Sequence, residues 1–399
     1  MSLQSNLLSL LVPLAAIFAS LYLINPIPHF LNNFTYLTLT TLSPSSLNLA
    51  PLTCNLHSIH HHRPHKKHPD SGNADSICDD FPPGIPPPDT NTTFYLCVDR
   101  KGCCNFTTVQ AAVNAIPDFS LKRTIIWINS GIYYEKVMVP KTKPNITFQG
   151  QGYTSTAIAW NDTALSANGT FSSGSVQVFA SNFIAKNISF MNLAPIPSPG
   201  AVGAQAVAIR ISGDQSEFRG CGFFGAQDTL HDDKGRHYFK DCYIQGSIDF
   251  IFGNARSLYE NCQLVSIANP VPAGQKSING AVTAHGRAST DENTGFTFVN
   301  STIGGNGRIW LGRAWRPYSR VVFAFTIMSD IIAPEGWNDF NDPSRDQTVF
   351  YGEYKCSGPG ADTSMRASYV QRLNDTQALA FLNITFIDGD QWLETSKLS

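Results

Sequence analysis

The chain has 399 residues, 42% of them hydrophobic and 15% charged, which is enough apolar material to bury a large core as one long domain or two. Its formal net charge is −2, and the first 68 residues hold three bases and no acid, so the remainder carries 25 bases against 30 acids. This balance excludes the basic footprint expected of a nucleic-acid-binding protein.

The chain opens on an apolar run from Leu7 to Ile24. Its length predicts a signal peptide or a signal anchor over residues 1–24, although the preceding MSLQSN lacks the usual positive charge. Cleavage and retention as an anchor both remain open. Ten Asn-x-Ser/Thr sequons agree with a secreted glycoprotein.

Residues 25–93 are rich in histidine and proline and predict a disordered linker, with metal capture or a pH-sensitive contact as the alternative for the histidines. We place the folded domain at 94–399. Nine cysteines are an odd number, so at least one is free or pairs between chains. Five of them lie in loop-like sequence, where disulfides are expected rather than a zinc site, with the pairing open: Cys54, Cys78, Cys97, Cys103 and Cys104.

The first element of the folded domain is a predicted helix over 106–116. Thr107 or Thr108 can act as its N-cap, and Pro117 ends it. We expect this helix to cap one end of the domain, and helical turns from 366–382 to cover the other end or the side.

Between these helices the chain repeats an aromatic residue, a cysteine three places later and an apolar residue after that. Phe218, Phe239 and Tyr259 are spaced by 21 and 20 residues. A period near twenty with several short strands predicts an all-β solenoid, the parallel β-helix. The cysteine column, Cys221, Cys242 and Cys262, is expected to pack inward as small hydrophobes, with a disulfide between two neighbours as the alternative.

The same repeat aligns two aspartates. Asp228 follows Cys221 by seven residues and Asp249 follows Cys242 by seven, so the two carboxylates should occupy equivalent points on neighbouring coils, about 4.8 Å apart. At that separation both cannot ionise freely, which predicts one protonated acid and one charged base. In GSIDFIFG, strand alternation would place Ile248, Phe250 and Phe252 on the core face. Ser247, Asp249 and Ile251 would then lie on the other face, with Asp249 on the outer wall.

Two reaction classes use such a pair: a retaining glycosidase, and ester cleavage in which one carboxylate attacks the carbonyl and the other protonates the alcohol. Ester cleavage also needs donors for an oxyanion. Gln227 and Gln205 supply amide N–H groups, which favours the ester.

The motifs QAVAIRISGD, GAQDTL, GSIDFIFGNA, LGRAW and YGEYKCSGPGADTSMR resemble those of the plant pectinesterases, and the likeness covers most of residues 94–395. The resemblance implies a right-handed parallel β-helix that hydrolyses methyl esters of polygalacturonate (pectin) in the cell wall, without a cofactor or metal. It also implies a secreted monomer, with pectin and a proteinaceous pectinesterase inhibitor as partners and no nucleic acid. The short N-terminal region resembles the type without an inhibitor-like pro-domain.

Matching residues then suggest roles. Asp249 resembles the nucleophile, Asp228 the proton donor, and Arg313 the cation that keeps Asp249 ionised. By the same resemblance Gln205 and Gln227 stabilise the tetrahedral intermediate, while Thr170, Trp315 and Trp337 contact the sugars. Simpler readings remain: a surface salt bridge for Arg313, stacked amides for the glutamines and packing for Trp315.

Two departures from the family pattern stand out. Ala226 replaces a tyrosine and Ala314 a proline, which puts sugar stacking in doubt but not the acid–base pair. A pectin-binding protein without turnover and a glycan-cleaving β-helix enzyme are therefore kept as alternatives.

Overall fold

The computed structural model describes residues 93–197, 201–272 and 274–393, all within one unit, Cys78–Ser399. The predicted signal segment, nearly all of the predicted linker and its histidines lie outside the described residues. No helix among the described residues is long and apolar enough to cross a membrane.

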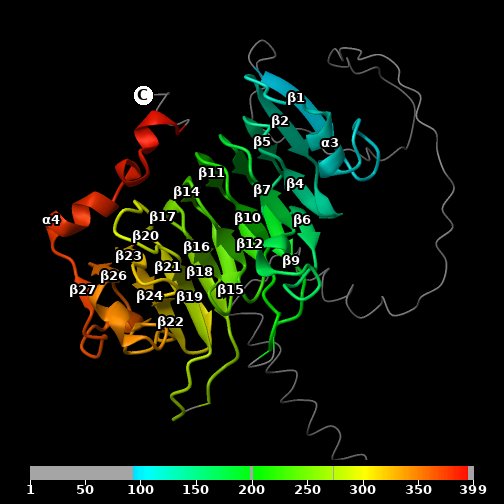
Figure 1. Cartoon of the computed structure of the whole chain (residues 1–399). Helices are drawn as coiled ribbons and strands as arrows, with labels where there is room; N and C mark the ends of the chain where they lie inside the picture. The colour runs from blue at the N-terminus through cyan, green and yellow to red at the C-terminus, as the bar shows by residue number, and fades with distance from the viewer. Residues whose placement is uncertain (1–92, 198–200, 273, 394–399) are drawn as a thin grey trace, which may run out of the picture. The chain divides into compact units, whose positions relative to one another are not determined.

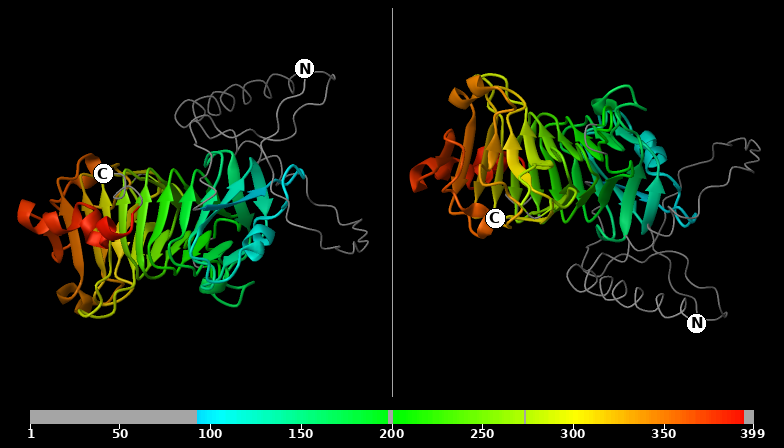
Figure 2. Two further views of the ribbon diagram at one scale, coloured as in Figure 1. Left: turned by 90° about the horizontal axis from the view of Figure 1, so that it is seen from above. Right: turned by 90° about the horizontal axis from the view of Figure 1, so that it is seen from below.

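The chain winds as a right-handed parallel β-helix, as predicted, with three parallel sheets (Figures 1 and 2). Sheet A contains β1 (Thr93–Val98), β2 (Arg123–Ile128), β5 (Ile146–Gln149), β8 (Ile184–Lys186), β11 (Ser216–Arg219), β14 (Arg236–Lys240), β17 (Arg256–Glu260), β20 (Gly295–Val299), β23 (Arg320–Ala324), β26 (Phe350–Tyr354) and β27 (Val370–Arg372). Sheet B contains β3 (Gly131–Tyr134), β6 (Thr156–Trp160), β9 (Ser189–Asn192), β12 (Gly222–Phe224), β15 (Tyr243–Gly246), β18 (Gln263–Ile267), β21 (Thr302–Asn306) and β24 (Ile327–Met328). Sheet C contains β4 (Val137–Val139), β7 (Val176–Val178), β10 (Ile209–Ile211), β13 (Leu230–Asp232), β16 (Ile251–Gly253), β19 (Gly280–His285), β22 (Ile309–Arg313) and β25 (Trp337–Asn338).

The predicted aromatic repeat forms a stacked ladder inside the β-helix. Phe218 pairs in register with Phe239, and Phe239 with Tyr259. Their ring centroids lie 4.9 Å and 4.4 Å apart, and Phe298 and Phe323 continue the stack. Identical positions on successive coils thus pack against each other, which is how a short repeat builds a continuous core.

The cysteine column packs inward without disulfides, as predicted. Cys221, Cys242 and Cys262 are buried free thiols beside the aromatic ladder. Each follows a residue with a left-handed backbone, Gly220, Asp241 and Asn261 having φ of 57°, 54° and 55°. Glycine, aspartate and asparagine tolerate this conformation best, so they make the sharp turn from sheet A into sheet B. In the predicted disulfide region, Cys97 bonds to Cys104.

The predicted N-terminal helix is α3, Val109–Ala115. Thr108 is its N-cap, accepting a hydrogen bond from the Ala111 N–H, and the Glu135 carboxylate accepts from the Val109 and Gln110 N–H groups at 2.7 Å and 2.9 Å. These contacts satisfy the first amides of the helix, whose apolar face joins the core next to β1 and β2 (Figure 1).

The segment predicted to give helical turns does so only in its second half. Its first half forms strand β27, and α4 (Asp375–Ala378) follows. The short 3₁₀ helices are η1 (Thr170–Ser172), η2 (Pro343–Gln347), η3 (Pro359–Ala361), η4 (Leu379–Phe381), η5 (Ile384–Ile387) and η6 (Gly389–Gln391). Ile387 and Leu393 pack with Leu258 and Val322 of sheet A, so the C-terminal turns cover the side of the β-helix.

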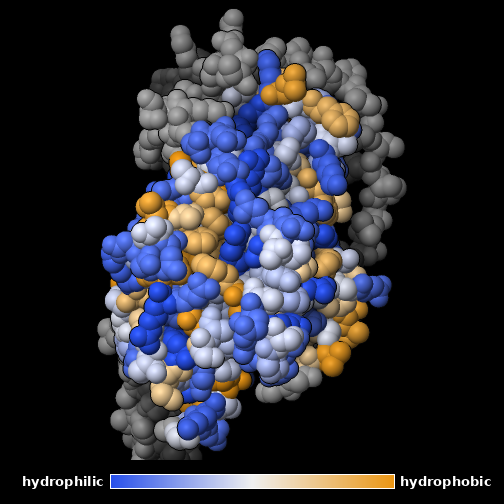
Figure 3. Space-filling model, turned by 60° about the vertical axis from the view of Figure 1, so that its left-hand side comes forward, coloured by the Kyte–Doolittle hydropathy of each residue, from blue (hydrophilic) through white to orange (hydrophobic). Residues whose placement is uncertain are grey.

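The surface between these elements is chemically mixed. Figure 3 shows one face, on which hydrophilic residues predominate and hydrophobic residues form small separate groups.

Candidate active site

Asp228 and Asp249 lie side by side on neighbouring coils, as the repeat predicts. Gln227 pairs with Ile248 in a parallel bridge, and three residues later Leu230 pairs with Ile251. The Asp228 N–H donates to the Ile248 carbonyl at 3.0 Å. The register therefore aligns the two aspartates, because both lie between the same pair of bridges.

Both aspartates adopt a left-handed backbone, with φ of 63° at Asp228 and 48° at Asp249. This corrects the predicted alternation through GSIDFIFG. The turn at Asp249 breaks the alternation, so Phe250 and Ile251 are both wholly buried in the main core. Two residues predicted to face the core do not join it. Ile248 is only half-buried, and Phe252 packs with Ala284, Val207 and Trp315 in a separate cluster.

Arg313, at the end of β22, holds the Asp249 carboxylate with two hydrogen bonds. Its Nε donates to Oδ1 of Asp249 at 2.9 Å, and a terminal nitrogen donates to Oδ2. Asp249 is 8% exposed, so this pairing compensates a carboxylate that has lost most of its water. The guanidinium also lies 4.8 Å from the ring centroid of Phe340, within cation–π distance.

The electrostatics separate the two carboxyl groups. Burial and then the nearby charge of Asp249 raise the pKa of Asp228 well above its usual range, although Arg313 opposes this. Burial disfavours the charge on Arg313, but its hydrogen bonds to Asp249 more than compensate, so its pKa is raised. Asp228 is thus the protonated acid and Asp249 the arginine-bound carboxylate, as the spacing of the two aspartates predicts.

Gln205 and Gln227 are positioned by backbone hydrogen bonds of adjacent coils. The Gln227 carbonyl accepts from the Ala206 N–H at 3.0 Å, and the Gln205 carbonyl accepts from the Ala164 N–H at 2.7 Å. Neither side-chain amide bonds to another residue in the part of the chain that the structure describes. Among the described residues the two amides therefore do not form the hydrogen-bonded ladder considered as the alternative.

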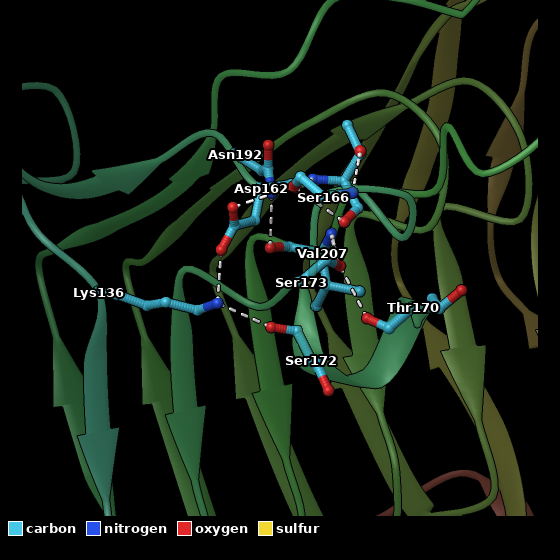
Figure 4. Close-up of polar contacts among 9 residues, drawn as sticks. Lys136, Asp162, Ser166, Thr170, Ser172, Ser173, Asn192 and Val207 are labelled. Carbon is cyan, nitrogen blue, oxygen red and sulfur yellow. Dashed lines mark hydrogen bonds and ion pairs between the residues drawn. The ribbon is translucent and has the colours of Figure 1, made fainter. Parts of the chain in front are cut away.

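Thr170 begins the short helix η1, which a polar network fixes above sheet C (Figure 4). Nζ of Lys136 donates to Asp162 at 2.5 Å and to the Ser172 carbonyl at 2.8 Å. The Ser173 hydroxyl donates to the Thr170 carbonyl and accepts from the Val207 N–H. The network thus links the Thr170 turn to the strand that follows Gln205.

The two predicted aromatic walls differ in position. Trp315 is half-buried and packs against Phe252, with ring centroids 6.0 Å apart. Trp337 is only 1% exposed, stacks on Tyr351, and donates from Nε1 to Glu353. The prediction that Trp337 contacts sugars is therefore wrong in this structure, since its ring belongs to the core.

The register explains the position of Trp337. It pairs with Gly312, and a Cβ at Gly312 would lie 2.9 Å from its ring, so glycine leaves the space that the indole fills. Phe340 of the same EGWNDF segment reaches Arg313 instead. Sequence reasoning missed Phe340, although its aromatic character beside the motif was a usable signal.

The two positions that depart from the family pattern are both buried. Ala226 is 5% exposed and Ala314 is not exposed. Arg345, also missed from the sequence, donates to the carbonyls of Ala314 and Trp315 and so supports the loop after Arg313. No motif singled out Arg345, because it comes from the separate helix η2.

Two buried histidines, His231 and His285, have pKa values well below that of a free imidazole. His231 lies between the rings of Phe171 and Phe252, at centroid distances of 4.7 Å and 4.3 Å. Burial lowers the pKa of His231 to about 4 and that of His285 to about 3. Both imidazoles are therefore neutral near pH 7 and cannot serve as proton donors in imidazolium form at that pH.

The comparisons with known proteins agree with this geometry. The pectinesterase family model matches residues 95–390. "Probable pectinesterase 8" of Arabidopsis thaliana is 73% identical over 323 residues, covering 81% of this chain and 82% of the relative. The structure of pectin methylesterase from carrot aligns with a TM-score of 0.69 at 35% identity, covering 76% of this chain and 95% of the carrot chain.

A second solved structure, a pectin methylesterase in complex with a hexasaccharide, aligns with a TM-score of 0.62 at 26% identity and covers 74% of this chain and 98% of that chain. The family match thus spans nearly all of the described β-helix, including both aspartates and Arg313. The chain belongs to the pectinesterase family of carboxylic ester hydrolases.

Proposed function

We propose that the chain removes methyl groups from pectin with Asp249 as nucleophile and Asp228 as proton donor. The observation that carries this proposal is the arginine-bound Asp249 carboxylate beside Asp228, whose pKa is strongly raised. A charged nucleophile and a neutral acid at adjacent positions are what hydrolysis of an ester through a covalent intermediate requires.

The reaction divides into two steps. In the first, an Asp249 oxygen attacks the ester carbonyl, Gln227 and Gln205 stabilise the developing oxyanion, and Asp228 gives its proton to the departing methanol. The product is an anhydride between Asp249 and the galacturonate. In the second step, ionised Asp228 removes a proton from water, which attacks the anhydride and releases the free acid and the Asp249 carboxylate.

Two further residues belong to the proposal as substrate contacts. The half-exposed Thr170 turn and Trp315 are proposed to hold the sugar chain, as the resemblance implies. The hexasaccharide bound in a solved relative supports an oligosaccharide substrate. Secretion to the cell wall, action as a monomer, binding of a proteinaceous inhibitor and absence of a pro-domain belong to this proposal as predictions.

Methanol release from highly methylated pectin tests the proposal. The purified protein should release methanol while the length of the polymer stays constant, since an esterase leaves glycosidic bonds intact. Absence of methanol between pH 5 and 9 would reject the activity, and shortening of the polymer would favour the glycan-cleaving alternative.

The pH dependence of methanol release should follow the protonation state of Asp228. This carboxyl must be protonated for methanol to leave, and its pKa is raised, so it remains protonated at pH values where an ordinary aspartate is ionised. We therefore expect kcat/KM to stay high through weakly acidic pH and to fall as the pH rises through the Asp228 pKa. Initial rates across the pH range, with folding followed by circular dichroism, measure this. A decline already complete at the usual aspartate pKa of about 4 would contradict it.

The network around the Thr170 turn gives a prediction about binding. Lys136→Met removes the ammonium that bonds to Asp162 and to the Ser172 carbonyl, and should raise KM by about 10-fold through misplacement of the turn, with little change in kcat. Lys355→Met, which removes a similar ion pair to Asp375, is the matched control and should change neither constant. An equal loss of kcat, or an unchanged KM, would show that the network does not position substrate.

A further inference from the structure

The Arg313 guanidinium acts on both carboxyl groups of the site. It bonds to Asp249, and its charge also opposes the rise in the pKa of Asp228. The aspartate that the guanidinium bonds is the one that it keeps ionised. The Arg313 side chain is 30% exposed, so burial alone does not fix where the guanidinium lies.

The ring of Phe340 contacts two guanidinium groups. Its centroid lies 4.8 Å from Cζ of Arg313 and 5.5 Å from Cζ of Arg345. Both cations are within the distance at which an aromatic face attracts them. Phe340 is half-buried and packs against the main core, so it gives the Arg313 guanidinium a fixed surface to rest against.

The backbone at Phe340 adopts a conformation that is rare for phenylalanine. Phe340 and Asn341 are both left-handed, with φ of 64° and 58°. The Asn338 side chain accepts a hydrogen bond from the Phe340 N–H at 2.9 Å, and Asn338 pairs in register with Arg313. The turn therefore starts beside Arg313 and brings the Phe340 ring back to its guanidinium. Backbone strain of this kind persists only where surrounding contacts enforce it.

Arg345 connects this turn to the loop after Arg313. It donates to the carbonyls of the two residues that follow Arg313, and its Nε donates to the Asp342 carboxylate at 3.0 Å. Asp342 is the N-cap of η2, the short helix that contains Arg345. Arg345 thus restrains the backbone beside Arg313, while Phe340 restrains the guanidinium.

From these contacts we infer that Phe340 and Arg345 are positioning residues. Together with Arg313 they form a cluster, the arginine clamp, that keeps the guanidinium on Asp249 and off Asp228. The inference rests on the proposed function. Without the clamp the guanidinium shares its charge with Asp228, which is then ionised over more of the working pH range and cannot protonate methanol. Asp249 at the same time loses part of the cation that keeps it charged.

The pKa of Asp228 distinguishes this role from simple packing. The charged groups that act on Asp228 are Asp249 and Arg313. The hydroxyl of Tyr351, which interacts with Arg313 and Asp249, is neutral because burial raises its pKa. Loss of the clamp should lower the Asp228 pKa, because the guanidinium then stabilises the ionised carboxylate. The alkaline decline of kcat/KM should accordingly move to lower pH.

Phe340→Leu tests the clamp without changing any charge. Leucine is apolar but has no aromatic face, so we expect kcat on methylated pectin to fall about 10-fold, in keeping with the strength of a cation–π contact, and the alkaline decline to move to lower pH. Phe340→Tyr keeps an aromatic face and should retain the wild-type profile.

Phe386→Leu is the matched control. The Phe386 ring is also half-buried and lies 5.8 Å from Cζ of an arginine, Arg320 of sheet A, which is outside the site. This variant should leave the pH profile unchanged. An unmoved decline in Phe340→Leu, or a shift of the same size in Phe340→Tyr or Phe386→Leu, would overturn the inference.

Carbon-13 NMR of labelled aspartate carboxyls measures the Asp228 pKa without turnover, with the signal assigned by its loss in Asp228→Asn. The pKa should be lower in Phe340→Leu than in the wild type. In an Arg313→Met background Phe340→Leu should leave it unchanged, because the ring acts through the guanidinium. A fall in that background as well would show that the ring only excludes water, and would refute the clamp. Failure of the proposed function looks different, because methanol release would be absent while these titrations could still be read.

Arg345→Met tests the other arm of the clamp. It should also lower kcat, and a protein carrying both Phe340→Leu and Arg345→Met should lose little more than the more impaired single variant, because both residues act through Arg313. Thermal midpoints show whether each variant is folded. Losses that multiply in the double variant would show that Arg345 acts independently of Phe340, and would contradict its place in the clamp.

Discussion

Replacing Asp249 with asparagine is expected to lower kcat for methyl-ester hydrolysis by more than about 10⁴-fold, because an amide cannot attack the ester carbonyl. Asparagine is the appropriate substitution, since Asp249 has φ of 48° and asparagine tolerates the left-handed region almost as well as aspartate does. Its carbonyl oxygen can still accept one hydrogen bond from Arg313. Methanol release under single-turnover conditions measures the loss.

The same variant should keep its fold. The residue lies in a turn before β16 and the core contacts of Phe250 and Ile251 do not involve its carboxylate. Circular dichroism and the thermal midpoint provide the control. A folded Asp249→Asn protein that retains even 10% of wild-type kcat would contradict the nucleophilic role.

Asp228→Asn has the second-largest expected effect, a loss of about 10²- to 10⁴-fold in kcat on methyl esters, because methanol then leaves without a proton donor. The substitution preserves the left-handed turn, where φ is 63°, and the backbone bond to Ile248. The loss should therefore come from chemistry rather than from unfolding.

The acidity of the leaving alcohol distinguishes a proton-donating role of Asp228 from a role in positioning the substrate. A trifluoroethyl ester releases a more acidic alcohol that needs less help from a proton donor. With this substrate the Asp228→Asn protein should release a first equivalent of alcohol rapidly and then turn over slowly, since Asp228 is also the base for the second step. Equal impairment of the first equivalent on both esters would show that Asp228 only positions the substrate.

The repeat in the sequence was informative because it reports on identical positions in successive coils. The spacing of Phe218, Phe239 and Tyr259 predicts their stacking, and the same offset aligns Asp228 with Asp249. The stacking of the aromatic rings and the alignment of the aspartates both follow from the same strand register. A single period in the sequence therefore predicts both the core and the carboxyl pair.

Local patterns failed where the backbone leaves the strand. The predicted alternation of side chains between the two faces of GSIDFIFG requires an extended backbone. The left-handed backbone at Asp249 interrupts this alternation, so Phe250 and Ile251 both lie in the same core. Trp337 was assigned to the sugar site from its motif, whereas its register against Gly312 buries it.

Contacts between distant segments could not be read from the sequence. Arg345 reaches the loop after Arg313 from η2. Ile196 and Ile278 line one pocket beside Arg313 although 82 positions separate them. Such contacts depend on how loops of different coils fold over the sheets. The period specifies the strands but leaves these loops undetermined.

Trapping the covalent intermediate tests the central claim most directly. Wild-type protein mixed with methylated oligogalacturonate and quenched into hydroxylamine should yield a hydroxamate at Asp249 or on the reacting galacturonate, because hydroxylamine cleaves an anhydride at either carbonyl. Mass spectrometry of the Asp249 peptide and of the sugar would detect it, with Asp249→Asn as the blank. Methanol release by the wild-type protein without any hydroxamate above that blank would mean that water attacks the ester directly, and that Asp249 is not the nucleophile.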